Sequence, residues 1–253
     1  MFNLFDYPFM VFVLALALFW SSALIGAWFH ERTHRPEGGT RDDYKLVLGG
    51  TLTLLGLIIG FTFSMAVSRY EQRKNYEAEE ANAIGTEYVR ADLLLPADAA
   101  RVRPLLKSYL ELRIRKYKSR NYKQIQQIDA ETARLQTQLW SAVATPASEQ
   151  LSPVTALAVS GMNDVLNSQG YTQAAWWNRI PIAAWILLIM ISIFCNALVG
   201  YSAQGRGGFL LLILPLTLSI SLFLIADIDC PHAGAIRVQP QNLQSLAESL
   251  NSR

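Results

Sequence analysis

Residues 46–68 decide the fold of this chain, and they read LVLGGTLTLLGLIIGFTFSMAVS. The stretch holds 23 residues, and none of them is Asp, Glu, Lys or Arg. A helix needs about 20 apolar residues to cross the ~30 Å hydrocarbon layer of a bilayer. The stretch therefore predicts a membrane-spanning helix.

Three other stretches are equally free of charge: 7–29, 180–204 and 207–226. Together with 46–68 they hold 91 of the 253 residues, so all 42 charged residues lie in the remaining 162. This division excludes a single soluble globular domain and predicts an all-α membrane protein with four transmembrane helices. No basic residue precedes the first stretch, which is also longer than the apolar part of a signal peptide, so we expect a retained anchor.

The four spans divide the chain into two transmembrane hairpins, 1–68 and 179–226, with a helical domain over 69–178 and a tail over 227–253. An even number of spans places both termini and the helical domain on one side of the membrane. The basic residues near the membrane number five on each side, so the positive-inside rule does not choose the orientation. A net charge of +2 gives no case for a nucleic-acid partner.

The helical domain sorts its charges along the sequence. Residues 76–98 carry six acids and one base, whereas residues 101–123 carry nine bases and one acid. Antiparallel helices that pair opposite faces would explain this pattern. Alternatively, the surplus bases face anionic lipid headgroups or attract anions from solution. The bases assigned to this second role are Arg101, Arg103, Lys107, Arg113, Arg115 and Lys116.

The span over 46–68 carries two stripes. Leu55, Ile59 and Phe63 repeat at i, i+4 and i+8 on one face, and small residues on another face would let a second helix approach closely. Both stripes could simply pack inside the subunit or meet lipid. In a homo-oligomer, the small residues would make the contacts, and the three large ones would form a hydrophobic neck that gates by dewetting. The small residues are Gly49, Thr53, Gly56, Gly60 and Ser64.

One short motif is typical of zinc peptidases. Residues 30–34 read HERTH, which on a helix would offer His30 and His34 to zinc and Glu31 as a general base. A catalytic zinc needs a third protein ligand, and the remaining histidine, His232, lies across the membrane in this topology. We therefore expect a solvated connection here.

A second cluster with metal-ligating residue types follows the last span. Asp227, Asp229 and His232 could coordinate a cation. Two carboxylates at a membrane exit are more often simply solvated. No metal or other cofactor is predicted.

Three blocks resemble the bestrophin-like bacterial membrane proteins, a family classed as a domain of unknown function. Two of them are GFTFSMAVSRYEQR over 60–73 and EEANAIGTEYVRADLL over 79–94. The third is DCPHAGAIRV over 229–238, which is similar to an Asp-x-Pro-x-x-Gly-x-Ile-x-Val pattern that the family has after its last span. The resemblance covers nearly the whole chain.

This resemblance implies a function and an orientation. Bestrophins are pentameric anion channels with four spans per subunit, cytosolic termini, a cytosolic helical region and a hydrophobic neck on the second span. By position, the neck here would be Leu55, Ile59 and Phe63. The implied partners are the lipid bilayer of a bacterial inner membrane, further copies of the chain and small inorganic anions. The long acidic run of calcium-activated animal bestrophins has no counterpart here.

The leading hypothesis is therefore a homo-oligomeric, bestrophin-like anion channel. A second is a non-conducting membrane sensor or scaffold whose cytosolic helices bind a partner. The third is the zinc peptidase built on His30, Glu31 and His34.

Overall fold

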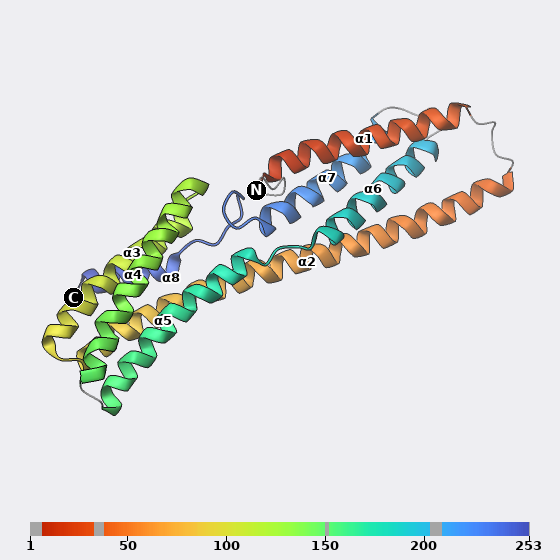
Figure 1. The fold of residues 1–253 in the computed structure, drawn as a ribbon. Helices are drawn as coiled ribbons and strands as arrows, with labels where there is room; N and C mark the ends of the chain where they lie inside the picture. Colours follow the sequence, from red (N-terminus) through yellow and green to blue (C-terminus); the bar gives the residue numbers. More distant parts are fainter. Residues whose placement is uncertain (1–6, 33–37, 150–151, 203–208, 253) are drawn as a thin grey trace. The chain divides into compact units, whose positions relative to one another are not determined.

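The computed structural model describes residues 7–32, 38–149, 152–202 and 209–252, and these form helices joined by short connections (Figure 1). Within these ranges there is no β-strand, which confirms the predicted all-α class. The helices are α1 (Pro8–Arg32), α2 (Gly38–Arg90), the short 3-10 helix η2 (Ala91–Leu93), α3 (Pro96–Lys118), α4 (Tyr122–Glu149), α5 (Pro153–Trp177), α6 (Ile182–Ser202), α7 (Leu210–Asp229) and α8 (Gln241–Asn251).

Four helical segments are long and apolar enough to cross a membrane, as the sequence predicts. They are Pro8–His30, a part of Tyr44–Leu93, a part of Pro153–Ser202, and Leu211–Asp229. Only the second of these continues into a strongly charged helical region without a break, because α2 is one helix of 53 residues.

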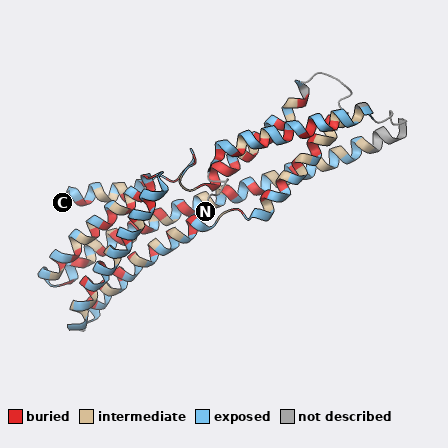
Figure 2. Ribbon diagram, turned by 45° about the horizontal axis from the view of Figure 1, so that its top comes forward, coloured by how far each residue is buried: buried red, intermediate tan, exposed pale blue. Residues whose placement is uncertain are grey.

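The chain forms two compact units. The first contains residues 1–69 and 179–237, and the second contains residues 70–178 and 238–253. Figure 2 colours the helices of both by burial, and in each unit buried positions recur along one side of a helix while exposed ones recur along the other.

In the first unit, α1 packs against α6 and α7. Phe12 on α1 meets Phe223 on α7 edge-on, with ring centroids 6.2 Å apart. Ser22 donates its hydroxyl hydrogen to the carbonyl of Ile193 at 2.8 Å, which ties α1 to α6. Hydrogen bonds of this kind and close contacts between small residues replace the hydrophobic effect as the force that holds helices together in lipid.

In the second unit, α3 packs on α4 and α4 packs on α5. The apolar interior includes Leu106, Leu139, Met162 and Val165, each 0% exposed. Burial of such side chains contributes about 1.5–3 kcal/mol each, so these contacts are a main source of this unit's stability.

Prolines lie at two helix boundaries of the second unit. Helix α2 ends at Arg90 and gives way to η2 before Pro96. Proline disfavours helical backbone at the residue before it, and Leu95 is accordingly non-helical while Pro96 begins α3. Similarly, α5 begins at Pro153, where the Ser152 side chain accepts a hydrogen bond from the Thr155 N–H in a capping box.

Helix α8, which the sequence does not predict, belongs to the second unit and packs on α3. Its first turn rests on Glu77 of α2, which is 1% exposed. The Glu77 carboxylate accepts a hydrogen bond from the Leu243 N–H at 2.9 Å and another from the Asn242 side chain at 2.6 Å. A carboxylate in this place also complements the positive end of the helix dipole.

Candidate functional site

The membrane segment of α2 is the least covered of the four. Only 11% of its most apolar window is buried, against 33%, 28% and 44% for the other three. Large apolar side chains on it remain exposed, among them Leu46, Leu54, Leu57 and Phe61. A single copy of the chain therefore covers one side of this span and leaves the rest of its surface to lipid or to another protein surface.

The small residues of this span do not pack inside their own unit. Gly49, Thr53, Gly56, Gly60 and Ser64 are all exposed. Among the described residues, a Cβ atom added at Gly49, Gly56 or Gly60 would meet nothing within 4 Å. Thr53 satisfies its hydroxyl by donating to the Gly49 carbonyl at 2.9 Å, which makes it tolerable in an apolar environment. These small residues therefore do not serve to pack α2 against other helices of the same subunit.

The three predicted neck residues do not share an exposed face. Leu55 is 1% exposed, Ile59 is half-buried and Phe63 is 41% exposed. Leu55 belongs with Thr62 and Ala66 to the side of α2 that is covered by its own unit. A position buried in its own subunit is poorly placed to line a pathway shared between subunits.

The opposite side of α2 carries another set with the same spacing. Positions two residues apart on a helix point about 200° away from each other. Thr53 and Leu57 thus lie nearly opposite Leu55, and Phe61 lies about 120° from it. Leu57 and Phe61 are 54% and 64% exposed. The sequence pattern does not distinguish this set from that of Leu55, because a four-residue repeat of apolar residues fits either register.

Asp229, at the end of α7, joins segments next to three spans. It is 1% exposed and accepts a hydrogen bond from the Ile180 N–H at 3.2 Å. Its carboxylate lies 3.3 Å from Arg179 Nε and 3.8 Å from Arg69 Nη1. The aspartate that could have been a metal ligand therefore works as a structural anchor between α2, α7 and the start of α6.

Asp227 has a similar role within the segment that follows α7. Its two carboxylate oxygens accept hydrogen bonds from the Ala235 and Ile236 N–H groups, each at 2.7 Å. Gly234 is required at this turn, because a Cβ there would lie 3.3 Å from the Asp227 carbonyl carbon and would overlap the carbonyl oxygen. The spacing of the 229–238 block thus reflects a folded-back loop.

Metal-ligating residues do not converge where the structure can be described. Within the described ranges, no group of three or more His, Cys, Asp or Glu side chains is arranged to hold a metal ion. The ring of His30 meets that of Tyr201 edge-on, with centroids 5.1 Å apart. The Glu31 side chain and His34 lie outside the described residues. His232 is half-buried.

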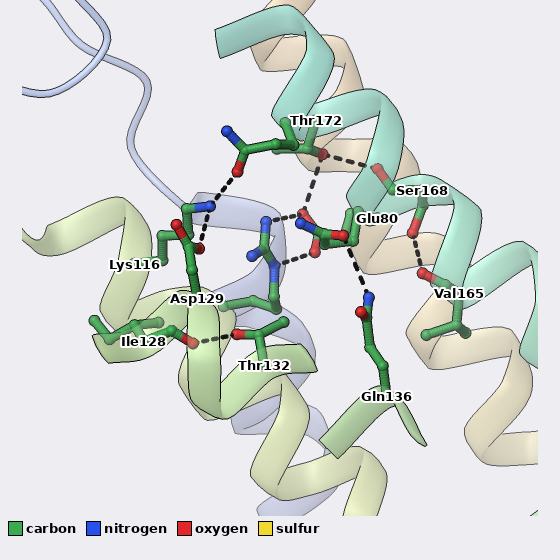
Figure 3. A network of polar contacts seen from close by, with 12 residues as sticks. Glu80, Lys116, Ile128, Asp129, Thr132, Gln136, Val165, Ser168 and Thr172 are labelled. Carbon is green, nitrogen blue, oxygen red and sulfur yellow. Dashed lines mark hydrogen bonds and ion pairs between the residues drawn. The ribbon is translucent and has the colours of Figure 1, made fainter. Parts of the chain in front are cut away.

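The basic stretch of α3 is divided by burial. Arg113 and Lys116 are 0% exposed, so neither faces solvent or a lipid surface in this structure. Figure 3 shows the polar network around Glu80, Lys116, Asp129 and Thr172, to which both side chains belong. Arg113 donates to Glu80 of α2 through Nε and, at 3.4 Å, through Nη2. Thr172 of α5 donates to the same carboxylate at 3.3 Å.

Lys116 forms the second half of this network. Its Nζ atom lies 2.5 Å from Asp129 of α4 and donates to Gln173 of α5 at 2.6 Å. It also lies 4.5 Å from the ring centroid of Trp176, a cation–π distance. The network therefore links α2, α3, α4 and α5 through charged groups rather than through apolar contacts alone.

Burial shapes the ionisation of these groups. Burial alone would lower the pKa of Arg113, but the adjacent Glu80 carboxylate outweighs it and raises the pKa, so the guanidinium stays charged. Burial lowers the pKa of Lys116, the nearby Arg113 charge adds to this effect, and Asp129 opposes it. Burial also raises the pKa of Tyr109 and of Tyr117.

The other four bases of the predicted set are at least partly accessible. Arg103 pairs with Asp92, and Lys107 donates to the Leu250 carbonyl at 2.7 Å. Arg115 lies 3.9 Å from Glu131, with both side chains more than half exposed, and Arg101 is exposed. Charge pairing between helices thus accounts for much of the basic stretch.

One sequence signal could have identified the buried arginine. Tyr109, Arg113 and Tyr117 recur at i, i+4 and i+8, and Leu106 and Leu110 lie on the same side of α3. A charged residue in the middle of an apolar stripe must find a buried partner of opposite charge.

Comparison with known proteins places the fold. The model of the Bestrophin-like domain family matches residues 13–243. No curated protein matches the chain. Two mutant forms of a bacterial bestrophin homolog from Klebsiella pneumoniae are similar in structure, both with a TM-score of 0.64. They are 15% and 17% identical to this chain, and the alignments cover 97% of both chains in one case and 95% and 96% in the other.

A third solved structure, described only as a membrane protein, has a TM-score of 0.67 at 15% identity and covers 95% of this chain and 97% of its own. At such low identity, these likenesses establish a shared fold over nearly the full length.

Proposed function

Since the chain belongs to the bestrophin-like family, we propose that it forms a homo-oligomeric anion channel, a pentamer by the family resemblance, with α2 of each subunit beside the symmetry axis. The family match favours a channel over an enzyme and supports a multi-pass membrane protein. The proposal extends to a bacterial inner membrane, with both termini and the second unit in the cytosol.

The observation that carries this proposal is the uncovered α2 span, which buries only 11% of its apolar window in a single copy. Neighbouring copies around an axis would cover its two flanks. Gly49, Gly56 and Gly60 are exposed, and no described atom lies within 4 Å of a Cβ added at any of them. Another helix can therefore approach the α2 backbone at these glycines. A pathway on the axis would be lined by the remaining strip.

For the constriction, exposure favours Leu57 and Phe61 over Leu55. Repeated around an axis, these two positions would give two apolar rings one turn apart, with Thr53 one turn further along α2. Ile59 and Phe63 of the original neck prediction keep some exposure and would lie toward one flank of the strip. Apolar rings of this kind gate by dewetting and carry no selectivity for charge.

Anion preference would then come from exposed positive charge outside the span. Of the six predicted bases, Arg101 and Arg115 are exposed. Surface potentials of this sign raise the local concentration of anions, and the effect weakens with ionic strength.

Flux through the purified protein tests the proposal. Protein reconstituted in liposomes should pass chloride, and Phe61→Ala and Leu57→Ala should change the rate several-fold. Leu24→Ala provides a matched control, because Leu24 is an equally exposed apolar residue on α1. The mass of the native complex in detergent should correspond to a closed homo-oligomer, with five copies by the family resemblance. Absence of flux in all forms, or a monomer that conducts nothing, would refute the channel.

A further inference from the structure

Glu87 is a buried carboxylate for which the second unit supplies no partner. The residue is 0% exposed, and neither Oε1 nor Oε2 has a hydrogen-bond partner among the described residues. Two other buried glutamates of α2 are satisfied: Glu80 by Arg113 and Thr172, and Glu77 by the first turn of α8. A buried charge without such partners is costly, and a proton that neutralises it removes most of that cost.

The Glu87 carboxyl lies in a contact between two helices. A Cβ atom built on Gly161 of α5 would overlap both Glu87 Oε2 and Arg90 Nη1 and would lie 3.0 Å from Arg90 Cδ. Gly161 is itself buried. The carboxyl and the arginine therefore fill the space that a side chain at position 161 would need, and α5 fits against α2 here because position 161 has none.

The charged groups around Glu87 offset the effect of its burial only in part. Arg90, on the same helix, directs Nη1 toward Asp164 of α5 at 4.0 Å, and it is partly open to solvent. Burial raises the pKa of Glu87 to about 8; the Arg90 cation opposes this shift and the Asp164 anion adds to it. Arg90 and Asp164 are the charged groups that face this carboxyl from α2 and α5.

We propose that Glu87 is a proton-binding site, neutral at pH 7, whose ionisation in mildly alkaline solution loosens the contact between α2 and α5 at Gly161. Because the pKa is higher in the folded chain than in the unfolded one, this group stabilises the fold fully below its ordinary pKa of 4.5. The stabilisation declines above that value and is lost as the pH rises through about 8. The site lies within the second unit and does not depend on whether the protein conducts.

The first test compares the pH dependence of unfolding in full-length protein. Glu87→Gln keeps the size of the side chain and fixes it in a neutral form. The wild-type unfolding temperature should fall relative to that of the variant as the pH rises from about 5, and the difference should level off above about pH 8. Glu71→Gln, on the exposed side of α2, should follow the wild type. Equal pH profiles for wild type and Glu87→Gln would overturn the proposal.

The second test needs no variant that might fail to fold. The infrared carbonyl band of a protonated carboxylic acid should be present in the wild type at pH 7 and should disappear as the pH is raised toward 9. Amide hydrogen exchange over residues 81–94 and 155–168 should accelerate over the same range beyond the intrinsic effect of base. If the wild type shows no protonated carboxyl at pH 7, Glu87 is ionised and the proposal fails.

Discussion

Gly26 on α1 and Gly200 on α6 make a reciprocal close contact within the first unit. A Cβ on Gly26 would lie 2.8 Å from the carbonyl carbon of Ala197, and one on Gly200 would lie 2.7 Å from that of Ala23. Each glycine thus faces the backbone of the other helix at the residue three positions before the other glycine. Backbone atoms cannot move aside as the end of a side chain can, so this pair sets the distance between the two helices.

Gly26→Ala and Gly200→Ala should each destabilise the protein by about 1–3 kcal/mol, because a methyl group at either position forces the helices apart. Thermal unfolding in detergent measures the effect. Gly170→Ala on α5 is the matched control, since a Cβ there meets nothing within 4 Å among the described residues and alanine favours the helix. Wild-type stability in both interface variants would mean that the helices can separate at no cost.

Arg113→Met should cost about 3–5 kcal/mol, because it leaves the Glu80 charge buried without its main partner. The double variant Glu80→Gln with Arg113→Met should recover most of this loss, since neither charge is then present. Arg103 lies on α3, as Arg113 does, but its ion pair with Asp92 of η2 is more exposed. Arg103→Met should therefore cost less than about 1 kcal/mol. Additive losses in the double variant would argue against direct coupling.

Lys116 should make stability depend on alkaline pH. Its pKa is lowered in the folded chain, mainly by burial, so the unfolded chain holds more protons in the window below the ordinary value of 10.5. The stability that this group contributes is full above 10.5 and is lost as the pH falls through the lowered value. Wild type should therefore gain stability relative to Lys116→Met as the pH rises. The exposed Lys74→Met is the control, and parallel profiles for all three proteins would contradict the assignment.

Asp229→Asn should lower the free energy of unfolding by about 1–3 kcal/mol, because the amide cannot replace the charge that Arg69 and Arg179 share. Chemical or thermal unfolding in detergent gives the value. Asp164→Asn removes a carboxylate whose side chain is 62% exposed and should change stability by less than about 0.5 kcal/mol. If both variants behave alike, Asp229 is not an anchor.

The four spans could be predicted because membrane insertion depends on a local property, namely about 20 residues without charge. Which side of a span is covered depends on helices that are distant in the sequence. Leu55 and Leu57 are chemically the same residue on opposite sides of α2, and the structure alone shows that the first is buried and the second is exposed. The neck prediction depends on that distinction.

The sequence also predicts only part of what the basic residues over 101–123 do. A count of charges over 101–123 treats Arg101 and Arg113 as equivalent, yet one is exposed and the other is enclosed by α2 and α5. Opposite charges on neighbouring helices did predict pairing, and the contacts of Arg113 with Glu80 and of Arg103 with Asp92 are of that kind. What the composition could not give is the depth at which each pair lies.

The hydrogen bonds between Glu77 and the first turn of α8 limit how the protein can be shortened or tagged. A shortened form that stops before Gln241 would strip the Glu77 carboxylate of the Leu243 and Asn242 donors and would uncover apolar side chains of the second unit. Helix α8 is therefore part of the folded second unit. A purification tag placed C-terminal to α8 needs a spacer long enough to leave the contact between α8 and Glu77 intact.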